Sequence, residues 1–239
     1  MKAVFVGDAH LQGRKDPNQS NFCDFLDNLK DIDHLFIMGD LFEYWVGYNR
    51  FIHHHYKPVI DGLIGLAHRG VKIIYMEGNH DFSLEPFFAA TIGADVYPDT
   101  ADIRYDGKRL LLSHGDVIDE KRSYVFLRAF LRSRPFRIFH RLVPPMVGWK
   151  IAIESARRSR AAMERGVVLE RTLRQYAREK IGEGFDLVVM GHTHLAALFH
   201  EEVNGQSGTY ANSGDWITDH SYLVYRDGVL SIENFQAAQ

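Results

Sequence analysis

Five short segments of the chain combine Asp, Asn and His residues in turns, and each turn follows an apolar run. They are Gly7-Asp8-Ala9-His10, Gly39-Asp40, Gly78-Asn79-His80-Asp81, Ser113-His114-Gly115-Asp116 and Gly191-His192-Thr193-His194. Carboxylate and amide oxygens and imidazole nitrogens are ligands that suit Mn²⁺, Zn²⁺, iron or Mg²⁺. Cys23 is the only cysteine, which excludes a zinc cluster held by thiolates. We therefore expect a metal site built from oxygen and nitrogen donors.

The number of donors predicts two metal ions. The candidate ligands are Asp8, His10, Asp40, Asn79, His114, His192 and His194. Seven donors are too many for one tetrahedral ion, but they suit two ions about 3.5 to 4 Å apart that share a carboxylate and a water. Such a pair stabilises both the attacking and the leaving oxygen of a phosphoryl displacement, and Asp40 is the natural bridge. One Gly-Asp turn alone is more often a plain strand end, so the hypothesis depends on all five segments together.

The first half of the chain alternates short strands with helices, which is typical of an α/β sandwich. Strands are predicted at 3–6, 35–38, 71–76, 109–112 and 187–190, and helices at 21–29, 51–68 and 84–90. Sites in open α/β sheets form beyond the carboxyl ends of the strands. The five polar turns follow such strands, so we expect them to meet at one edge.

The pattern changes after residue 190, where short strands predict an antiparallel meander. These strands are expected at 207–211, 222–225 and 229–232, with Asp227-Gly228 as a hairpin turn. The turn at 212–216 follows the first of them and is expected to support the loop that carries His192 and His194.

Composition bounds the class of protein. With 239 residues, 46% hydrophobic and 25% charged, the chain is an ordinary globular protein rather than a disordered, collagenous or coiled-coil one. Its longest apolar runs fall far below the roughly 20 residues that span a bilayer, and its start does not resemble a signal peptide. We expect one domain over residues 1–239 and a cytoplasmic location.

Charge is unevenly distributed along the chain. Residues 121–180 hold 16 Lys and Arg against 4 Asp and Glu, a net +12, so the remainder carries −15. This window predicts helices at 122–131, 136–142 and within 148–181, and we interpret it as a helical lid inserted at about 120–182. Aromatic and arginine residues interleave there, which suits an anionic membrane surface. The alternative is a lid that packs on the core and solvates its arginines.

The insertion also bears on the choice of ligand. Arg157, Arg158 and Arg160 could pair with phosphate, because the guanidinium fork matches phosphate oxygens. Nucleic acid is the other usual partner of a basic helical patch. The acidic body and the many apolar side chains beside the arginines argue against nucleic acid.

The five segments, in this order, resemble the signature of the calcineurin-type metallophosphoesterases. The resemblance covers nearly the whole chain and implies a four-layer α/β/β/α sandwich with two divalent ions, Mn²⁺ first, with Zn²⁺, Fe²⁺ or Mg²⁺ as alternatives. The implied ligands are Asp8, His10, Asp40 and His194 for one ion, and Asp40, Asn79, His114 and His192 for the other. A metal-activated water would attack phosphorus. His80 would protonate the leaving oxygen or stabilise the charged transition state, with Asp81 orienting its imidazole.

Within that family, the run at 39–47 and the helical insertion resemble the UDP-2,3-diacylglucosamine pyrophosphohydrolases of lipid A synthesis. That resemblance implies attack at the α-phosphorus, giving UMP and 2,3-diacylglucosamine 1-phosphate, at the inner face of the cell membrane. The expected substrate contacts are Asn79, His80, Asp119, Arg157, Ser159 and His192. The chain departs from the narrower pattern at His80, where those enzymes carry Arg, and at Met163 and Gly166, where they carry Asn and Lys.

Two other functions stay open. The same site could serve as a general phosphodiesterase or phosphatase for a soluble nucleotide or phosphorylated metabolite, with the lid as a specificity cap. The fold could also be a non-catalytic binding scaffold, although a scaffold has no physical need for seven metal donors and an acid. The sequence does not decide the oligomeric state.

Overall fold

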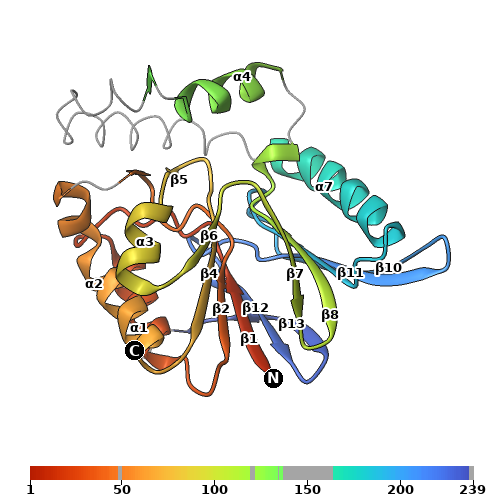
Figure 1. The fold of residues 1–239 in the computed structure, drawn as a ribbon, viewed down its shortest axis with the longest axis horizontal. Helices are drawn as coiled ribbons and strands as arrows, with labels where there is room; N and C mark the ends of the chain where they lie inside the picture. The colour runs from red at the N-terminus through yellow and green to blue at the C-terminus, as the bar shows by residue number, and fades with distance from the viewer. Residues whose placement is uncertain (48–49, 119–121, 134, 137–163, 237–239) are drawn as a thin grey trace.

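The structure is a computed structural model that describes residues 1–47, 50–118, 122–133, 135–136 and 164–236 (Figure 1). Nearly half of the predicted lid, chiefly residues 137–163, lies outside these residues. Residues 137–142 of the helix expected at 136–142, and residues 148–163 of the helical region expected at 148–181, are among those outside.

The first sheet has six strands in the order β13-β12-β1-β2-β4-β6. Their bounds are β1 Lys2–Val6, β2 His34–Ile37, β4 Lys72–Met76, β6 Asp95–Tyr97, β12 Ser221–Arg226 and β13 Val229–Asn234. Strands β1, β2, β4 and β6 are parallel neighbours, whereas β12 pairs antiparallel with β1. The parallel strands place their carboxyl ends at one edge, as the polar turns require.

The second sheet has five strands in the order β10-β11-β9-β8-β7. Their bounds are β7 Thr100–Tyr105, β8 Lys108–Ser113, β9 Leu187–Met190, β10 Ala197–Val203 and β11 Gln206–Asn212. Strands β8, β9 and β11 run parallel, so the carboxyl ends of β8 and β9 also lie at one edge. A third, two-stranded sheet pairs β3 (Trp45–Val46) with β5 (Asp81–Phe82).

Helices cover the outer faces of the two large sheets (Figure 1). Helices α1 (Pro17–Asn28), α2 (Arg50–His68) and α3 (Glu85–Ile92) form a layer on the first sheet, and α7 (Glu164–Gly182) packs on the second. The predicted α/β/β/α sandwich is confirmed.

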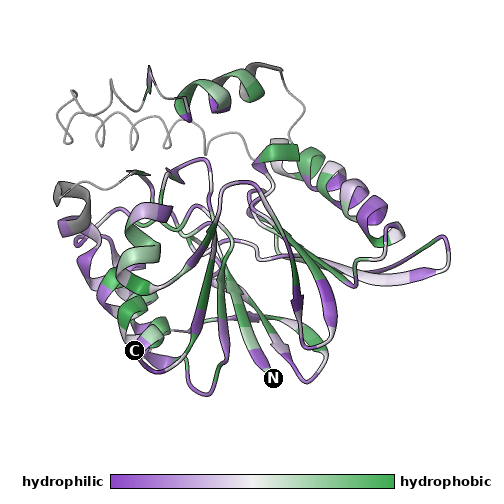
Figure 2. Ribbon diagram, in the orientation of Figure 1, coloured by the Kyte–Doolittle hydropathy of each residue, from purple (hydrophilic) through white to green (hydrophobic). Residues whose placement is uncertain are grey.

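Alternation of side chains along the strands builds the layers. In β1, Phe5 points into the cluster between the two sheets, while Val4 and Val6 pack against the helices α1 and α2. In β9, Val189 lies between the sheets and Val188 faces α7. Figure 2 shows the hydrophobic strands enclosed by more polar loops. A core of this kind fixes the strand ends rigidly, and with them the turns that follow.

The C-terminal strands form two hairpins instead of the single meander that the sequence predicts. Strands β10 and β11 pair in the second sheet, whereas β12 and β13 pair in the first. Apolar alternation predicts strands but not the sheet they join, because either sheet can bury the same face. The Asp227-Gly228 turn is confirmed: both residues have positive φ, 50° and 88°, as a two-residue hairpin turn needs.

The insertion starts with η1 (Asp116–Ile118) and α4 (Arg122–Leu131) and returns through α7. The helix expected at 122–131 is therefore confirmed at both ends. Helix α4 lies apart from the two sheets, at the end where the polar turns gather (Figure 1). Its exposed face carries Val125, Phe126 and Phe130, which are 51 to 76% exposed.

Candidate metal centre

The loops after β1, β2, β4, β8 and β9 meet at the carboxyl ends of the strands, as the sequence predicts. Main-chain hydrogen bonds hold neighbouring loops together: Asp8 N donates to Gly39 O at 3.0 Å, and His10 N donates to Asp40 O at 2.9 Å. On the second sheet, Gly191 N donates to His114 O at 2.9 Å. Side chains that are far apart in sequence therefore lie close together at this end of the two sheets.

The expected ligands fall into three overlapping groups, each with ligand atoms within 4.8 Å of one another. They are Asp8, His10 and His194; His10, Asp40 and His80; and Asp40, His114 and His192. They contain six of the seven expected ligands and also His80, the expected proton donor, whereas Asn79 adjoins the third group through its Oδ1, 3.3 Å from His114 Nε2. Asp40 belongs to two groups, since its Oδ2 lies 3.6 Å from His10 Nε2 and 3.4 Å from His114 Nε2. This central place is the one expected of a bridge.

The rings of the histidines present Nε2 to the centre. His114 Nδ1 donates to Met38 O at 2.8 Å, which leaves Nε2, 3.3 Å from Asn79 Oδ1, as the atom that can bind a metal once it gives up its proton. His194 Nε2 and His10 Nε2 lie 3.6 and 3.9 Å from Asp8 Oδ1. These nitrogens and the oxygens of Asp8, Asp40 and Asn79 converge.

Five of the seven expected ligands adopt the left-handed backbone conformation. The φ angles are 50° at Asp8, 44° at His10, 49° at Asp40, 72° at His192 and 61° at His194. Such angles cost energy in residues with a Cβ and persist where the surrounding structure imposes them, typically at functional sites. This strained backbone conformation directs the side chains at the strand ends into one small volume.

Glycine at the start of a turn makes room for a neighbouring ligand. A Cβ on Gly191 would lie 2.6 Å from Asp8 Oδ2, the atom that accepts a hydrogen bond from His192 N at 2.8 Å. A Cβ on Gly78 would overlap the Asp40 carboxylate in the same way. Glycine at these two positions is thus required by the carboxylate it faces.

Burial and neighbouring charges shift the pKa values of the residues in the centre in opposite directions. Burial opposes the imidazolium of His114, but the nearby carboxylates, Asp40 first and then Asp8 and Asp116, together outweigh burial and raise the pKa of His114 to about 10. Burial raises the pKa of Asp8 to about 6 and lowers that of His192 to about 3. The centre therefore holds neutral and charged imidazoles beside buried carboxylates.

A divalent cation fits this set of donors. Asp8 Oδ1 and His10 Nε2 are buried and have no hydrogen-bond partner among the residues that the structure describes. A buried acceptor costs free energy unless it is hydrogen-bonded or coordinated. Ligation would satisfy both atoms, and the O and N donors match Mn²⁺, Zn²⁺ or Fe²⁺ rather than a soft metal.

Asp81 has a different contact set from the one expected. Its carboxylate accepts hydrogen bonds from the backbone N–H groups of residues 40, 41, 42 and 78 and from Tyr75 OH. It therefore shapes the loop of Asp40, and the expectation that it orients the His80 imidazole is wrong. His80 Nδ1 instead lies 3.1 Å from Glu43 O and 3.3 Å from Glu43 Oε1.

A second polar cluster supports the loop of His192 and His194. Asn212 Nδ2 donates to Gly191 O at 2.9 Å and to Thr193 Oγ1 at 3.0 Å, as expected of the turn that begins there. Glu170 on α7 accepts hydrogen bonds from Thr193 Oγ1 and Tyr210 OH. Sequence reasoning missed Glu170, although it is one of only four acidic residues in the basic window 121–180.

Helix α4 is fastened to the loop that carries Asn79. Arg132 Nη2 donates to Gly78 O and Arg132 Nη1 pairs with Glu77 Oε2, both at 3.0 Å. Arg128 Nε pairs with Asp116 Oδ2 at 2.7 Å. Both ends of the insertion, α4 and α7, thus contact loops that carry expected ligands.

The remaining candidate residues are only partly placed. Asp119, Arg157 and Ser159 lie outside the described residues. Gly166, on α7, lies beside the loop of His194, because a Cβ there would be 3.1 Å from Thr193 O. Asn79 and His192 both lie at the centre.

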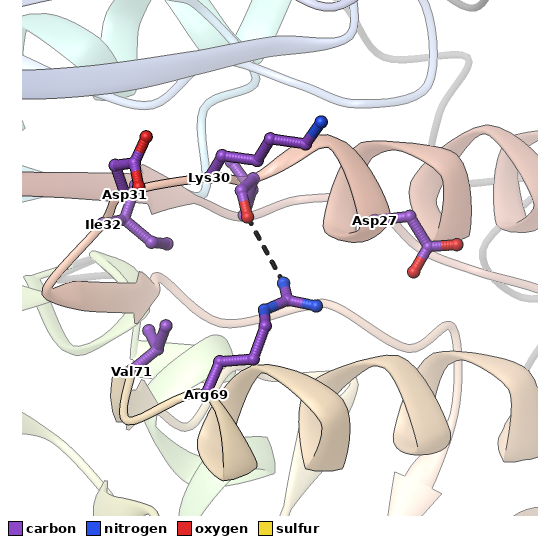
Figure 3. A pocket seen from close by; sticks show the side chains of 7 residues that line it. Asp27, Lys30, Asp31, Ile32, Arg69 and Val71 are labelled. Atoms are coloured by element: carbon purple, nitrogen blue, oxygen red, sulfur yellow. Dashed lines mark hydrogen bonds between the residues drawn. The ribbon is translucent and has the colours of Figure 1, made fainter.

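A separate cavity of about 390 Å³ lies at the opposite edge of the first sheet, where β2 and β4 begin (Figure 3). Its lining residues are Asp27, Leu29, Lys30, Asp31, Ile32, Arg69 and Val71. Arg69 Nη2 donates across it to Leu29 O at 3.3 Å. It holds no candidate ligand from the sequence.

Comparison with known proteins decides the family. The family model for calcineurin-like phosphoesterases matches residues 1–196, which carry all seven expected ligands. The chain belongs to the calcineurin-like phosphoesterase family. It is therefore a hydrolase, and the divalent-metal dependence of metallophosphoesterases accounts for the Asp and His clusters.

Relatives of this phosphoesterase match over nearly its whole length. The UDP-2,3-diacylglucosamine hydrolase of Ralstonia nicotianae is 30% identical over 96% of this chain and 91% of its own. That of Aeromonas salmonicida is 30% identical over 98% and 93%. A solved archaeal phosphodiesterase has the same fold, with a TM-score of 0.51 at 15% identity over 98% of this chain and all of its own.

Across the described residues, the helices are too short or too polar to cross a bilayer.

Proposed function

We propose that this phosphoesterase hydrolyses the pyrophosphate of UDP-2,3-diacylglucosamine, giving UMP and 2,3-diacylglucosamine 1-phosphate in lipid A synthesis. The observation that carries the proposal is the match to two relatives named UDP-2,3-diacylglucosamine hydrolase. Each is 30% identical to this chain, and each match covers nearly the whole chain, insertion included. The resemblance of the run at 39–47 to the same enzymes points the same way.

Two divalent ions are proposed to occupy the centre, with Mn²⁺ as the first candidate. Asp8, His10 and His194 would hold one, His114, His192 and Asn79 the other, and Asp40 would contact both. The three overlapping ligand groups and the central place of Asp40 Oδ2 support this division. When bound, such a pair lowers the pKa of water toward 7 and neutralises developing phosphoryl charge.

The side chains outside the ligand set then account for the rest of the reaction. His80 is 24% exposed and faces the centre, and its Nδ1 is occupied by Glu43. Its Nε2 would donate a proton to the oxygen that leaves the α-phosphorus, while the oxygen of water becomes part of UMP. Asp40 and Glu43 outweigh the effect of burial and raise the pKa of His80 to about 9, so the donor is charged at neutral pH.

A second candidate function keeps the site and changes the substrate. His80 stands where the lipid A enzymes carry Arg, which favours a phosphodiesterase or phosphatase for a soluble nucleotide. A cap that includes α4 would then select by size and charge.

A substrate panel separates the two. Purified protein with Mn²⁺ is given UDP-2,3-diacylglucosamine, UDP-glucose and bis-para-nitrophenyl phosphate, and products are identified by mass spectrometry. We expect UMP from the diacyl substrate at a kcat/KM at least about 100-fold above that for UDP-glucose, because the acyl chains add apolar contacts worth several kcal/mol. Equal rates on both UDP sugars, or cleavage of the aryl ester alone, would reject the lipid substrate and leave the second candidate.

A further inference from the structure

Glu43 is a buried carboxylate between two of the histidines of the centre. It lies in the loop between β2 and β3, three residues after Asp40, and is fully buried. Its backbone is fixed, because Glu43 N donates to Leu11 O at 3.0 Å. An acidic side chain rarely occupies such a position unless it is paired.

One oxygen of Glu43 faces the Nδ1 atoms of both histidines. Oε1 lies 3.3 Å from His80 Nδ1 and 3.8 Å from His10 Nδ1. The two rings meet edge to face with centroids 4.7 Å apart. The other oxygen, Oε2, accepts a hydrogen bond from Gln12 Nε2 at 3.4 Å.

This arrangement decides which nitrogen each ring offers to the centre. An imidazole with Nδ1 directed at a carboxylate carries its proton there, which leaves Nε2 as the working atom. For His10, Nε2 is the atom that faces Asp8 and Asp40. For His80, a main-chain oxygen and a carboxylate both oppose Nδ1, so the ring cannot flip without losing two acceptors.

We propose that Glu43 is a positioning residue that orients a metal ligand and the proton donor at once, His10 and His80. The inference deepens the proposed function, because it takes the roles of both histidines from it. It does not depend on the lipid substrate. Any phosphoester cut at this centre would need the same orientation.

Two diaryl esters test the effect of Glu43 on His80. Diphenyl phosphate releases phenol, whose pKa of about 10 makes it dependent on a proton donor, whereas bis-para-nitrophenyl phosphate releases a far weaker base. We expect Glu43→Gln to lower kcat on diphenyl phosphate at least about tenfold more than on the nitrophenyl ester. In a His80→Ala background, Glu43→Gln should add no further difference between the esters.

Metal binding tests the effect of Glu43 on His10, and this measurement needs no turnover. Loss of a carboxylate that orients a ligating histidine typically costs about 10- to 100-fold in metal affinity. We expect that loss for Mn²⁺ in Glu43→Gln, measured by titration calorimetry. Imidazole ¹⁵N spectra of the metal-free protein, recorded at a pH above the pKa of His80 so that its ring is neutral, should show His80 protonated at Nδ1, and in the variant a mixture of tautomers or a shifted Nδ1 resonance.

Glu201→Gln is the matched control, because Glu201 is also buried and charged but pairs with Arg174 and Arg178 away from the centre. It should lose stability without changing the ratio of the two esters or the Mn²⁺ affinity. An equal fall on both esters with unchanged affinity would reduce Glu43 to a packing role and overturn the proposal, as would wild-type behaviour. If the wild type cuts the esters but spares UDP-2,3-diacylglucosamine, the proposed substrate fails and this inference is still tested.

Discussion

Replacement of Asp40 by Asn should reduce kcat with Mn²⁺ at least about 10³-fold. The Oδ2 atom of Asp40 lies between His10 and His114, and its Oδ1 accepts a hydrogen bond from His80 N at 2.8 Å. Asn can keep the hydrogen bond to the backbone but has no charge to share between two cations. A loss of several kcal/mol of transition-state stabilisation corresponds to this factor.

The fold should survive this change. Asn is isosteric, and the backbone of residue 40 stays bonded to Asp81 and His10. Circular dichroism should therefore match the wild type. Asp102→Asn is the control, since Asp102 is half-exposed and pairs with Arg109 at the surface. Activity of Asp40→Asn within tenfold of the wild type would contradict the role of Asp40 as a bridge.

Removal of divalent cations should abolish activity and lower Tm by about 10 °C, both restored by Mn²⁺. A ligand at about 1,000 times its Kd stabilises the folded state by about 4 kcal/mol, and a protein of this size loses about 2–4 °C per kcal/mol. Without cations, Asp8 and Asp40 face each other in a buried centre, which helps to raise the pKa of Asp8 after the larger effect of burial. Thermal scans with and without a chelator measure this effect.

The same experiment has a proton signature. The pKa of His114, raised to about 10 by the nearby carboxylates against burial, keeps this imidazole charged at pH 7, yet its Nε2 must be neutral to coordinate a metal. Burial lowers the pKa of His10 and His194, so these rings are already neutral. We expect about one proton released per protein at pH 7 and tighter binding as pH rises toward 10. Calorimetry in buffers of different ionisation enthalpy that shows no proton release would contradict this assignment.

The metal centre follows from the sequence to a large extent, for a physical reason. Each ligand belongs to a short motif at the end of a strand, and parallel strands bring such ends together whatever the loops between them do. Asp8, Asp40 and His114 are therefore placed by local sequence plus topology alone. The strained φ angles and the close glycine contacts are consequences of that convergence.

The residues that orient the ligands are harder to predict. Glu43 and Glu170 act through hydrogen bonds or ion pairs of their side chains, and most of the partners are far away in sequence. The assignment of Asp81 failed because adjacency to His80 was taken for contact, whereas the turn directs Asp81 at the backbone of the Asp40 loop. The two C-terminal hairpins were also mispredicted, because a strand pattern in the sequence does not indicate which sheet the strand joins.

The most direct test of the account is hydrolysis of UDP-2,3-diacylglucosamine in water labelled with oxygen-18. The substrate is incubated with the Mn²⁺-loaded protein, and the position of the label is determined by mass spectrometry. Attack at the α-phosphorus predicts one labelled oxygen in UMP and none in 2,3-diacylglucosamine 1-phosphate. Label in the sugar phosphate, or no UMP at all, would contradict the proposed reaction.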